Sequence, residues 1–94
     1  MEKYLVVIEK AENNYSAFSP DVGGCVATGN TAEQTSLLMR EALQLHFENN
    51  LETDAGIPQP KGISQHIADG VFDKGEVAEE YFITEIKVPV PQQV

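Results

Sequence analysis

The longest periodic segment of the chain runs from Thr31 to about residue 51 and predicts one amphipathic helix. Thr31-Ala32-Glu33-Gln34 fits a capping box, in which the Thr31 hydroxyl and the Gln34 amide satisfy free backbone N–H groups at the helix start. At 100° per residue the apolar side chains gather on one side, and we expect that side to lie on a sheet. Its members are Leu38, Met39, Ala42, Leu45 and His46, widened by Ala32, Leu43 and Phe47.

Four segments outside this helix have the composition of strands. Residues 3–10, KYLVVIEK, carry apolar side chains on both alternating faces, which is typical of a strand near the middle of a sheet. Residues 15–18 and 25–28 predict two further strands, and the alternating residues 79–88 predict a last one. The expected fold is α+β in the order β-β-β-α-β: an antiparallel three-stranded meander, a long helix packed on it, and a closing strand.

The length of 94 residues predicts a single domain covering residues 1–94. Within it we expect a β-β-β-α core over 1–52 and a Pro/Gly linker over 53–78. A short helix is expected inside that linker at 63–70, because Ile63, Ile67 and Val71 repeat every four residues. The closing strand covers 79–90, and Pro89 and Pro91 should prevent further pairing.

The charge balance is strongly acidic: six Lys and Arg against fifteen Asp and Glu give a net charge of −9. Because nucleic acid is bound mainly by cations that neutralise phosphates, direct DNA or RNA binding is not expected. A basic partner is favoured instead. A single cysteine fits a reducing compartment, and the N-terminus has only five successive apolar residues. We therefore expect a cytoplasmic protein without a membrane segment.

The residues that could carry chemistry form no reaction centre in the sequence. A nucleophilic Cys25 would need a base, and the only histidines, His46 and His66, show no pairing with it. We predict a structural, buried Cys25 and a surface or capping His66. No two of the three lie at metal-ligand spacing, and the glycines around Cys25 lack the lysine of a phosphate loop. The predictions are therefore no catalytic residue, no metal and no cofactor.

Surplus apolar residues on the helix are candidates for an interface. Leu37 and Leu51 fall on its polar side, and Phe47 belongs to an apolar arc wider than one sheet face needs. Isolated exposed leucines are an equally good explanation for them. The small core, the wide arc and a closing strand at a sheet edge predict a homodimer or tetramer.

Residues 4–60 resemble the N-terminal domain of the HicB antitoxin family. The family pattern is a hairpin, Pro-Asp-Leu-Pro-Gly-Cys, a short strand ending in Gly-x-Thr, a long helix containing Arg-Glu-Ala-Leu, and Ile-Pro-x-Pro. The matching positions are Pro20, Asp21, Gly24, Cys25, Gly29, Thr31, Arg40 to Leu43, Ile57, Pro58 and Pro60. The first six of these form the structural hallmark. One departure is Val22-Gly23-Gly24, where the family usually has Leu-Pro-Gly.

The resemblance implies a degenerate ribonuclease-H-like fold without that enzyme's carboxylates. It also implies a partner: a small basic HicA toxin with a double-stranded-RNA-binding-like fold, which cleaves messenger RNA with a histidine. The antitoxin would cover that toxin's active site. Many relatives add a DNA-binding domain, and residues 61–94 do not resemble one. The alternatives are an orphan oligomeric interaction domain without a toxin and, third, an enzyme such as a cysteine hydrolase or nuclease.

Overall fold

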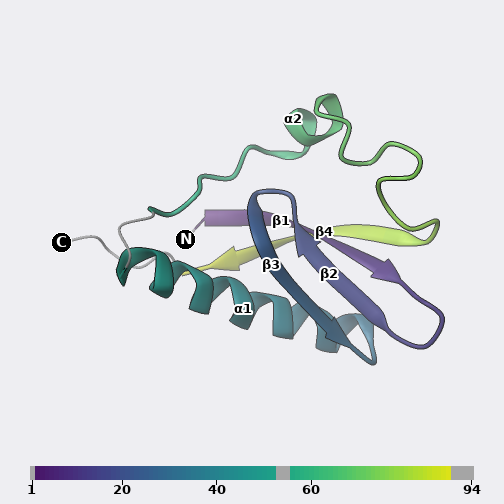
Figure 1. The fold of residues 1–94 in the computed structure, drawn as a ribbon, viewed down its shortest axis with the longest axis horizontal. Helices are drawn as coiled ribbons and strands as arrows, with labels where there is room; N and C mark the ends of the chain where they lie inside the picture. Colours follow the sequence, from purple (N-terminus) through teal and green to yellow (C-terminus); the bar gives the residue numbers. More distant parts are fainter. Residues whose placement is uncertain (1, 53–55, 90–94) are drawn as a thin grey trace.

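Four strands and two helices make up the part of the chain that the computed structural model describes, residues 2–52 and 56–89. In chain order they are β1 (Glu2–Lys10), β2 (Tyr15–Ser19), β3 (Val22–Gly29), α1 (Ala32–Glu52), α2 (Ile63–Ala68) and β4 (Tyr81–Val88). The predicted order of strands and long helix is confirmed, and the short helix lies inside the predicted linker (Figure 1). The predictions for residues 53–55 and for Pro91 fall outside the described residues.

The strands form one antiparallel sheet in the order β3-β2-β1-β4. As predicted, β1 lies inside the sheet and is covered on both faces. Its alternate residues Tyr4, Val6 and Ile8 face α1, whereas Leu5 and Val7 face the opposite side, and all five are at most 3% exposed. The closing strand therefore joins the meander beside its first strand. Their pairing is unbroken from Glu2↔Val88 to Glu9↔Tyr81.

The core lies between the sheet and α1. Three α1 side chains at four-residue spacing, Met39, Leu43 and Phe47, are fully buried against the sheet. Thr35 continues this line one turn earlier and is also buried, with its hydroxyl donating to the Thr31 carbonyl at 2.7 Å. The whole cluster comprises Tyr4, Val6, Ile8, Ala17, Val22, Cys25, Met39, Leu43, Phe47, Ile86 and Val88.

The buried stripe of α1 is narrower than the predicted one. Leu38 and Leu45, which were expected to pack on the sheet, are 37% and 59% exposed. The reason is geometric: residues four apart drift by only about 40° around a helix, so the line from Thr35 to Phe47 covers a narrow contact. Leu38 and Leu45 lie to one side of that line. The prediction of their burial was wrong.

The start of α1 has the predicted cap, with one shift. The Gln34 N–H donates to the Thr31 hydroxyl at 3.0 Å. The Gln34 side-chain oxygen accepts the Asn30 N–H at 2.8 Å, so it reaches the residue before the cap rather than Thr31 itself. Two backbone donors that the helix cannot satisfy internally are satisfied in this way.

Strand β3 is longer than the predicted 25–28 because the two glycines belong to it. Its pairing with β2 jumps from Phe18↔Val26 to Ser19↔Val22, so three residues of β3 bulge out of the ladder. Gly24 within this bulge has a φ of 81°, a conformation that L-residues with a Cβ rarely adopt. The bulge lets the chain turn at Pro20-Asp21 and still return Cys25 to the core.

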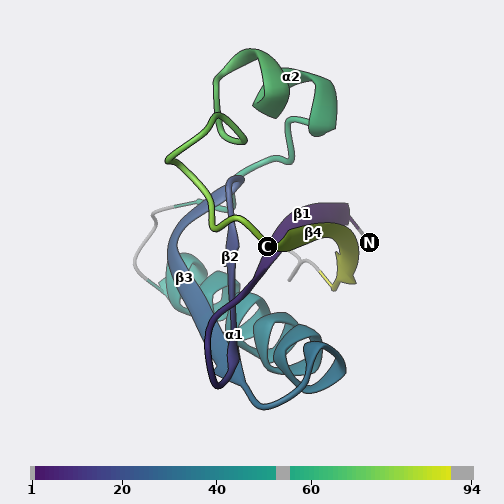
Figure 2. The same cartoon turned by 90° about the vertical axis from the view of Figure 1, so that its right-hand side faces the viewer.

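We call residues 56–70 the strap; it begins beside the core, against which Ile57 packs, and its helix α2 lies on the sheet face opposite α1 (Figure 2). Figure 2 shows α2, the helix of the strap, on one side of the sheet and α1 on the other. The strap therefore covers the Leu5 and Val7 face of β1. Ile63 and Ile67, whose spacing predicted α2, are 44% and 59% exposed, and the buried residue of this helix is His66.

Candidate functional site

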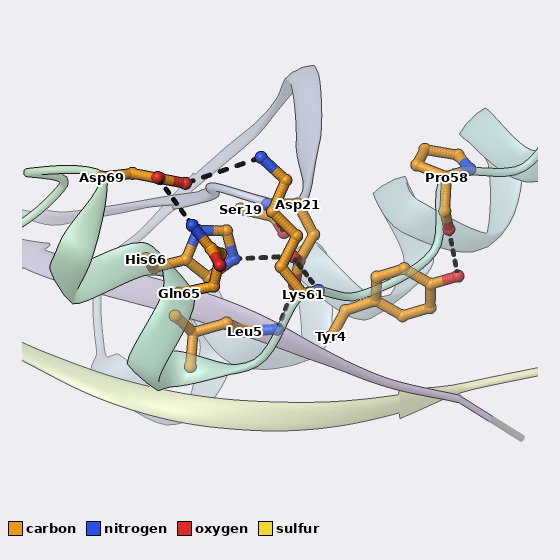
Figure 3. A network of polar contacts seen from close by, with 9 residues as sticks. All are labelled: Tyr4, Leu5, Ser19, Asp21, Pro58, Lys61, Gln65, His66 and Asp69. Carbon is orange, nitrogen blue, oxygen red and sulfur yellow. Dashed lines mark hydrogen bonds and ion pairs between the residues drawn. The ribbon is translucent and has the colours of Figure 1, made fainter.

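The Asp21 carboxylate is the centre of a polar network that ties the strap to the sheet (Figure 3). Its Oδ2 accepts the Leu5 N–H at 3.0 Å. Its Oδ1 accepts the Lys61 N–H at 2.9 Å and lies 2.6 Å from His66 Nε2. The Asp21 side chain is completely buried and that of His66 is 2% exposed. One carboxylate thus joins β1, the β2–β3 turn and α2.

The sheet itself explains why a carboxylate is needed at Asp21. Pairing between β1 and β2 extends only from Lys10↔Tyr15 to Val7↔Phe18, so the Leu5 N–H has no strand partner on that side. Asp21 Oδ2 takes the place of the missing backbone acceptor. The Ser19 hydroxyl in turn accepts the Asp21 N–H at 3.2 Å and holds the turn. A buried backbone donor without such a partner would cost free energy comparable to a lost hydrogen bond.

The second half of the network concerns His66, which the sequence predicted to be a surface or capping residue. That prediction was wrong, because the imidazole is buried against Asp21. An ionised carboxylate can only accept hydrogen bonds, so Nε2 carries the proton and donates it. The apolar spacing of Ile63 and Ile67 favoured the opposite face of α2. The acidic hallmark residue Asp21, far away in sequence, was the only signal of a buried donor.

A second attachment fixes the start of the strap. The Tyr4 hydroxyl donates to the Pro58 carbonyl at 2.7 Å, and the fully buried Tyr4 ring packs on Phe47 with 5.0 Å between ring centroids. Tyr4 therefore contacts the strap with its polar end and α1 with its ring. Pro58 belongs to the Ile-Pro-x-Pro segment that the sequence singled out.

The described geometry gives Asp21, His66 and Cys25 structural roles, because none of them lies in a site that is open to solvent. Asp21 and His66 are sealed from solvent. Cys25 is 5% exposed and belongs to the core, and burial raises the pKa of its thiol above the ordinary range. A thiol that keeps its proton is a poor nucleophile. Within the described ranges, no three His, Cys, Asp or Glu side chains gather in a way that could hold a metal ion.

The remaining hallmark residues shape the backbone around Cys25. Gly29 permits a close approach between the end of β3 and α1, because a Cβ there would lie 2.7 Å from Thr35 Oγ1 and 3.1 Å from its backbone nitrogen. Thr31 caps α1 and Pro20 lies in the β2–β3 turn. The segment from Pro20 to Thr31 thus forms the β2–β3 turn and the bulge of β3, and it ends in the cap of α1.

The three candidate interface residues are placed very differently. Leu37 is 63% exposed on the outer face of α1, as its position on the polar side predicted. Phe47 is fully buried, so its assignment to an interface is corrected: the ring is part of the core beside Tyr4. Leu51 lies in the last turn of α1, and its side chain is outside the described part of the structure.

The outer face of α1 combines two exposed leucines with carboxylates. Leu37, Glu41 and Leu45 follow one another at four-residue spacing, and Glu48 comes one turn after Leu45. All four side chains are exposed. Residues three or four apart are neighbours on a helix surface, so these side chains form one continuous strip, which we call the acidic strip. Such a surface suits a partner that is basic and offers an apolar contact. None of the described helices is both long and apolar enough to cross a membrane.

Comparison with known structures places the fold among antitoxins. The chain aligns with the N-terminal domain of Burkholderia pseudomallei antitoxin HicB with a TM-score of 0.76 and 17% identity, covering 94% of this chain and 99% of that one. It aligns with a chain of the HicA3 and HicB3 toxin-antitoxin complex with a TM-score of 0.71 and 24% identity, covering 93% and 98%. At these identities the likeness shows the fold.

Sequence comparison gives the family. Residues 4–87 match the model of the HicB-like antitoxins of bacterial toxin-antitoxin systems, and the chain belongs to this family. It is also 38% identical over 64 residues to an uncharacterised 14.9 kDa protein in the rep-hol intergenic region of Haemophilus phage HP1. The match covers 68% of this chain and 48% of the phage protein, so the chain spans about half the length of that relative.

Proposed function

We propose that this protein is an antitoxin that binds a small basic HicA-type toxin and covers the site with which that toxin cleaves messenger RNA. The observation that carries the proposal is the family match over residues 4–87. A structure of similar fold comes from a complex of HicA3 with HicB3. The protein would act by occlusion and contribute no reaction of its own, which agrees with the burial of Asp21, His66 and Cys25.

Charge supports the choice of partner. A ribonuclease that binds RNA needs a cationic surface for the phosphates. A protein with a net charge of −9 is attracted to such a surface and repelled by RNA itself. Binding at the cationic surface and inhibition then have the same cause, because carboxylates of the antitoxin occupy the place of the phosphates.

The acidic strip is the surface we assign to the toxin. Glu41 and Glu48 would face its cations, and Leu37 and Leu45, which alternate with them along the strip, would supply an apolar contact. Buried apolar anchors surrounded by charges are a common arrangement in specific interfaces. The strip lies on the side of α1 that does not contact the sheet, so binding would leave the core unchanged.

The test is inhibition of the toxin by variants of equal charge. The neighbouring reading frames are searched for a small basic protein, any such protein is purified, and its cleavage of a labelled RNA is measured with increasing antitoxin. The double variant Glu41→Lys/Glu48→Lys should lose inhibition by at least about tenfold, since reversing two interface charges costs at least about 1.4 kcal/mol, which is tenfold in affinity. The control Glu12→Lys/Glu76→Lys makes the same change in net charge at exposed loop residues that do not belong to α1.

Equal loss in the two double variants would show that only net charge matters and would remove the acidic strip from the proposal. Failure of the unaltered protein to bind or inhibit any such basic ribonuclease would contradict the antitoxin function itself. An orphan interaction domain would then be the better description.

A further inference from the structure

The sheet has two outer strands, and they differ in their capacity to pair with another chain. Strand β3 is interrupted by its bulge and by Gly24 at a φ of 81°. Bulges of this kind twist an edge away from a regular partner. Strand β4 has no such interruption: all eight residues from Tyr81 to Val88 pair in one register with β1. Only the β4 edge is therefore a regular template.

The hydrogen bond of Leu5 shows which groups of β4 point outward. The Leu5 N–H points away from β4, toward Asp21, and Leu5 lies opposite Glu85. In an antiparallel ladder such a pair is not hydrogen-bonded, so the Glu85 N–H and C=O point to the open edge. The same holds for every second residue: Tyr81, Ile83, Glu85 and Lys87. Within the described residues these backbone groups have no hydrogen-bond partner.

The side chains of this edge strand are more apolar than those of the edge strands of monomeric proteins usually are. Phe82 is 45% exposed and Tyr81 37%, and Ile83 is partly exposed. Monomeric proteins usually protect a long edge with charges, prolines or a bulge. In β4 the first proline comes only after Val88, and the charged residues Glu85 and Lys87 carry opposite signs.

We propose that β4 pairs antiparallel with β4 of a second copy, about a two-fold axis through Thr84. This inference goes beyond the antitoxin function and does not depend on it. The backbone N–H and C=O of Ile83, which point outward, would form two hydrogen bonds with Glu85 of the second copy. Tyr81 would form two more with Lys87 of the second copy. Two four-stranded sheets would become one continuous sheet of eight strands, with α1 of both copies on the same face.

The choice of register follows from length and charge. An axis at Glu85 would place two carboxylates directly opposite each other. An axis at Ile83 leaves only residues 81–85 in the pairing, and an axis at Ile86 soon reaches Pro89, which has no N–H to donate. The axis at Thr84 pairs residues 81–87. It also places Phe82 opposite Ile86 in a position where side chains are close.

A cysteine at the axis tests the register directly. Thr84 faces its own copy in a non-hydrogen-bonded pair, where the Cα atoms are about 4.5 Å apart, within the range that a disulfide spans. Oxidised Thr84→Cys should therefore form a covalent dimer on a non-reducing gel. Val26→Cys, on the other edge strand and 67% exposed, is the matched control and should remain monomeric. The native Cys25 is buried and does not interfere.

A proline at the edge tests the pairing without a new cysteine. Glu85→Pro removes a donor that points outward and leaves the ladder with β1 intact, whereas Glu85→Ala removes only the charge. Sedimentation should show a dimer for the unaltered protein and for Glu85→Ala, and a folded monomer, with unchanged circular dichroism, for Glu85→Pro. A monomeric unaltered protein at high micromolar concentration, or no disulfide in Thr84→Cys, would overturn the proposal. Neither result would bear on toxin inhibition.

Discussion

Asp21 Oδ1 and His66 Nε2 lie 2.6 Å apart although 45 residues separate them in the chain. This contact, with those to Leu5 and Lys61, closes the strap over the face of β1 that α1 leaves open. The hallmark Pro-Asp of the sequence therefore has a definite physical task. It supplies one buried acceptor for three donors from separate parts of the fold.

Replacing Asp21 by alanine should destabilise the protein strongly. The Leu5 and Lys61 N–H groups and the His66 imidazole would lose their acceptor, and breaking a buried polar pair costs about 3–5 kcal/mol. Urea unfolding followed by circular dichroism measures the change. Asp69→Ala is the matched control: its carboxylate pairs with Lys61 at 3.6 Å on the surface, so we expect a loss below about 1 kcal/mol. Similar losses in the two variants would contradict the central role of Asp21.

Replacing His66 by alanine should loosen the strap before the rest of the fold. A hydrogen bond to a charged group contributes about 1.5–3 kcal/mol, so amides of residues 61–70 should exchange roughly ten- to a hundredfold faster. Amides in the middle of α1 should change much less. Hydrogen exchange by mass spectrometry separates the two regions. Gln65→Ala, which removes only an exposed contact to Asp69, serves as the control. Uniform acceleration over the whole chain would mean that the strap does not open locally.

Replacing Gly29 by alanine should cost about 1–3 kcal/mol through overpacking against Thr35. Gly23→Ala, in the same strand with no atom within 4 Å of the added carbon, should be close to neutral. The double variant Gly29→Ala/Thr35→Ala should recover part of the loss, because the nearest contact is the Thr35 hydroxyl. Additive losses in this cycle, measured by urea unfolding, would show that the hydroxyl is not the obstacle.

The raised pKa of Cys25 predicts a loss of stability at alkaline pH. Because burial keeps the thiol protonated in the folded state, the unfolded state releases its proton first as pH rises. The free energy of unfolding therefore stays level below the ordinary thiol range and falls from about pH 8 upward, until the folded thiol also ionises. Urea midpoints across this range should fall less in Cys25→Ala. The native thiol should also react slowly with a thiol reagent until urea unfolds the chain.

Salt should affect the two proposed associations in opposite directions. Two copies with a charge of −9 repel each other, so added salt should strengthen the β4 dimer. Attraction to a basic toxin is screened by the same salt and should weaken. Sedimentation of the protein alone and titration with the toxin measure these trends. A dimer that dissociates as salt rises would contradict pairing through the largely apolar β4 edge.

The sequence determined the features that depend on neighbours along the chain. Alternation in β1, the cap at Thr31 and the long helical period in α1 are local patterns, and they were sufficient to predict the elements and the central place of β1. The family pattern around Cys25 added the fold class.

Only the tertiary structure decided which side chains of different elements pack against each other. The burial of His66 depends on Asp21, and the exposure of Leu38 and Leu45 depends on how narrowly α1 meets the sheet. Phe47 belongs to the core because Tyr4 lies opposite it. Such contacts join distant residues, and a local period gives the face of an element without naming what packs on it. The open β4 edge is also a feature of the tertiary structure. The sequence predicts the strand, but only the assembled sheet shows which of its two sides has no neighbouring strand.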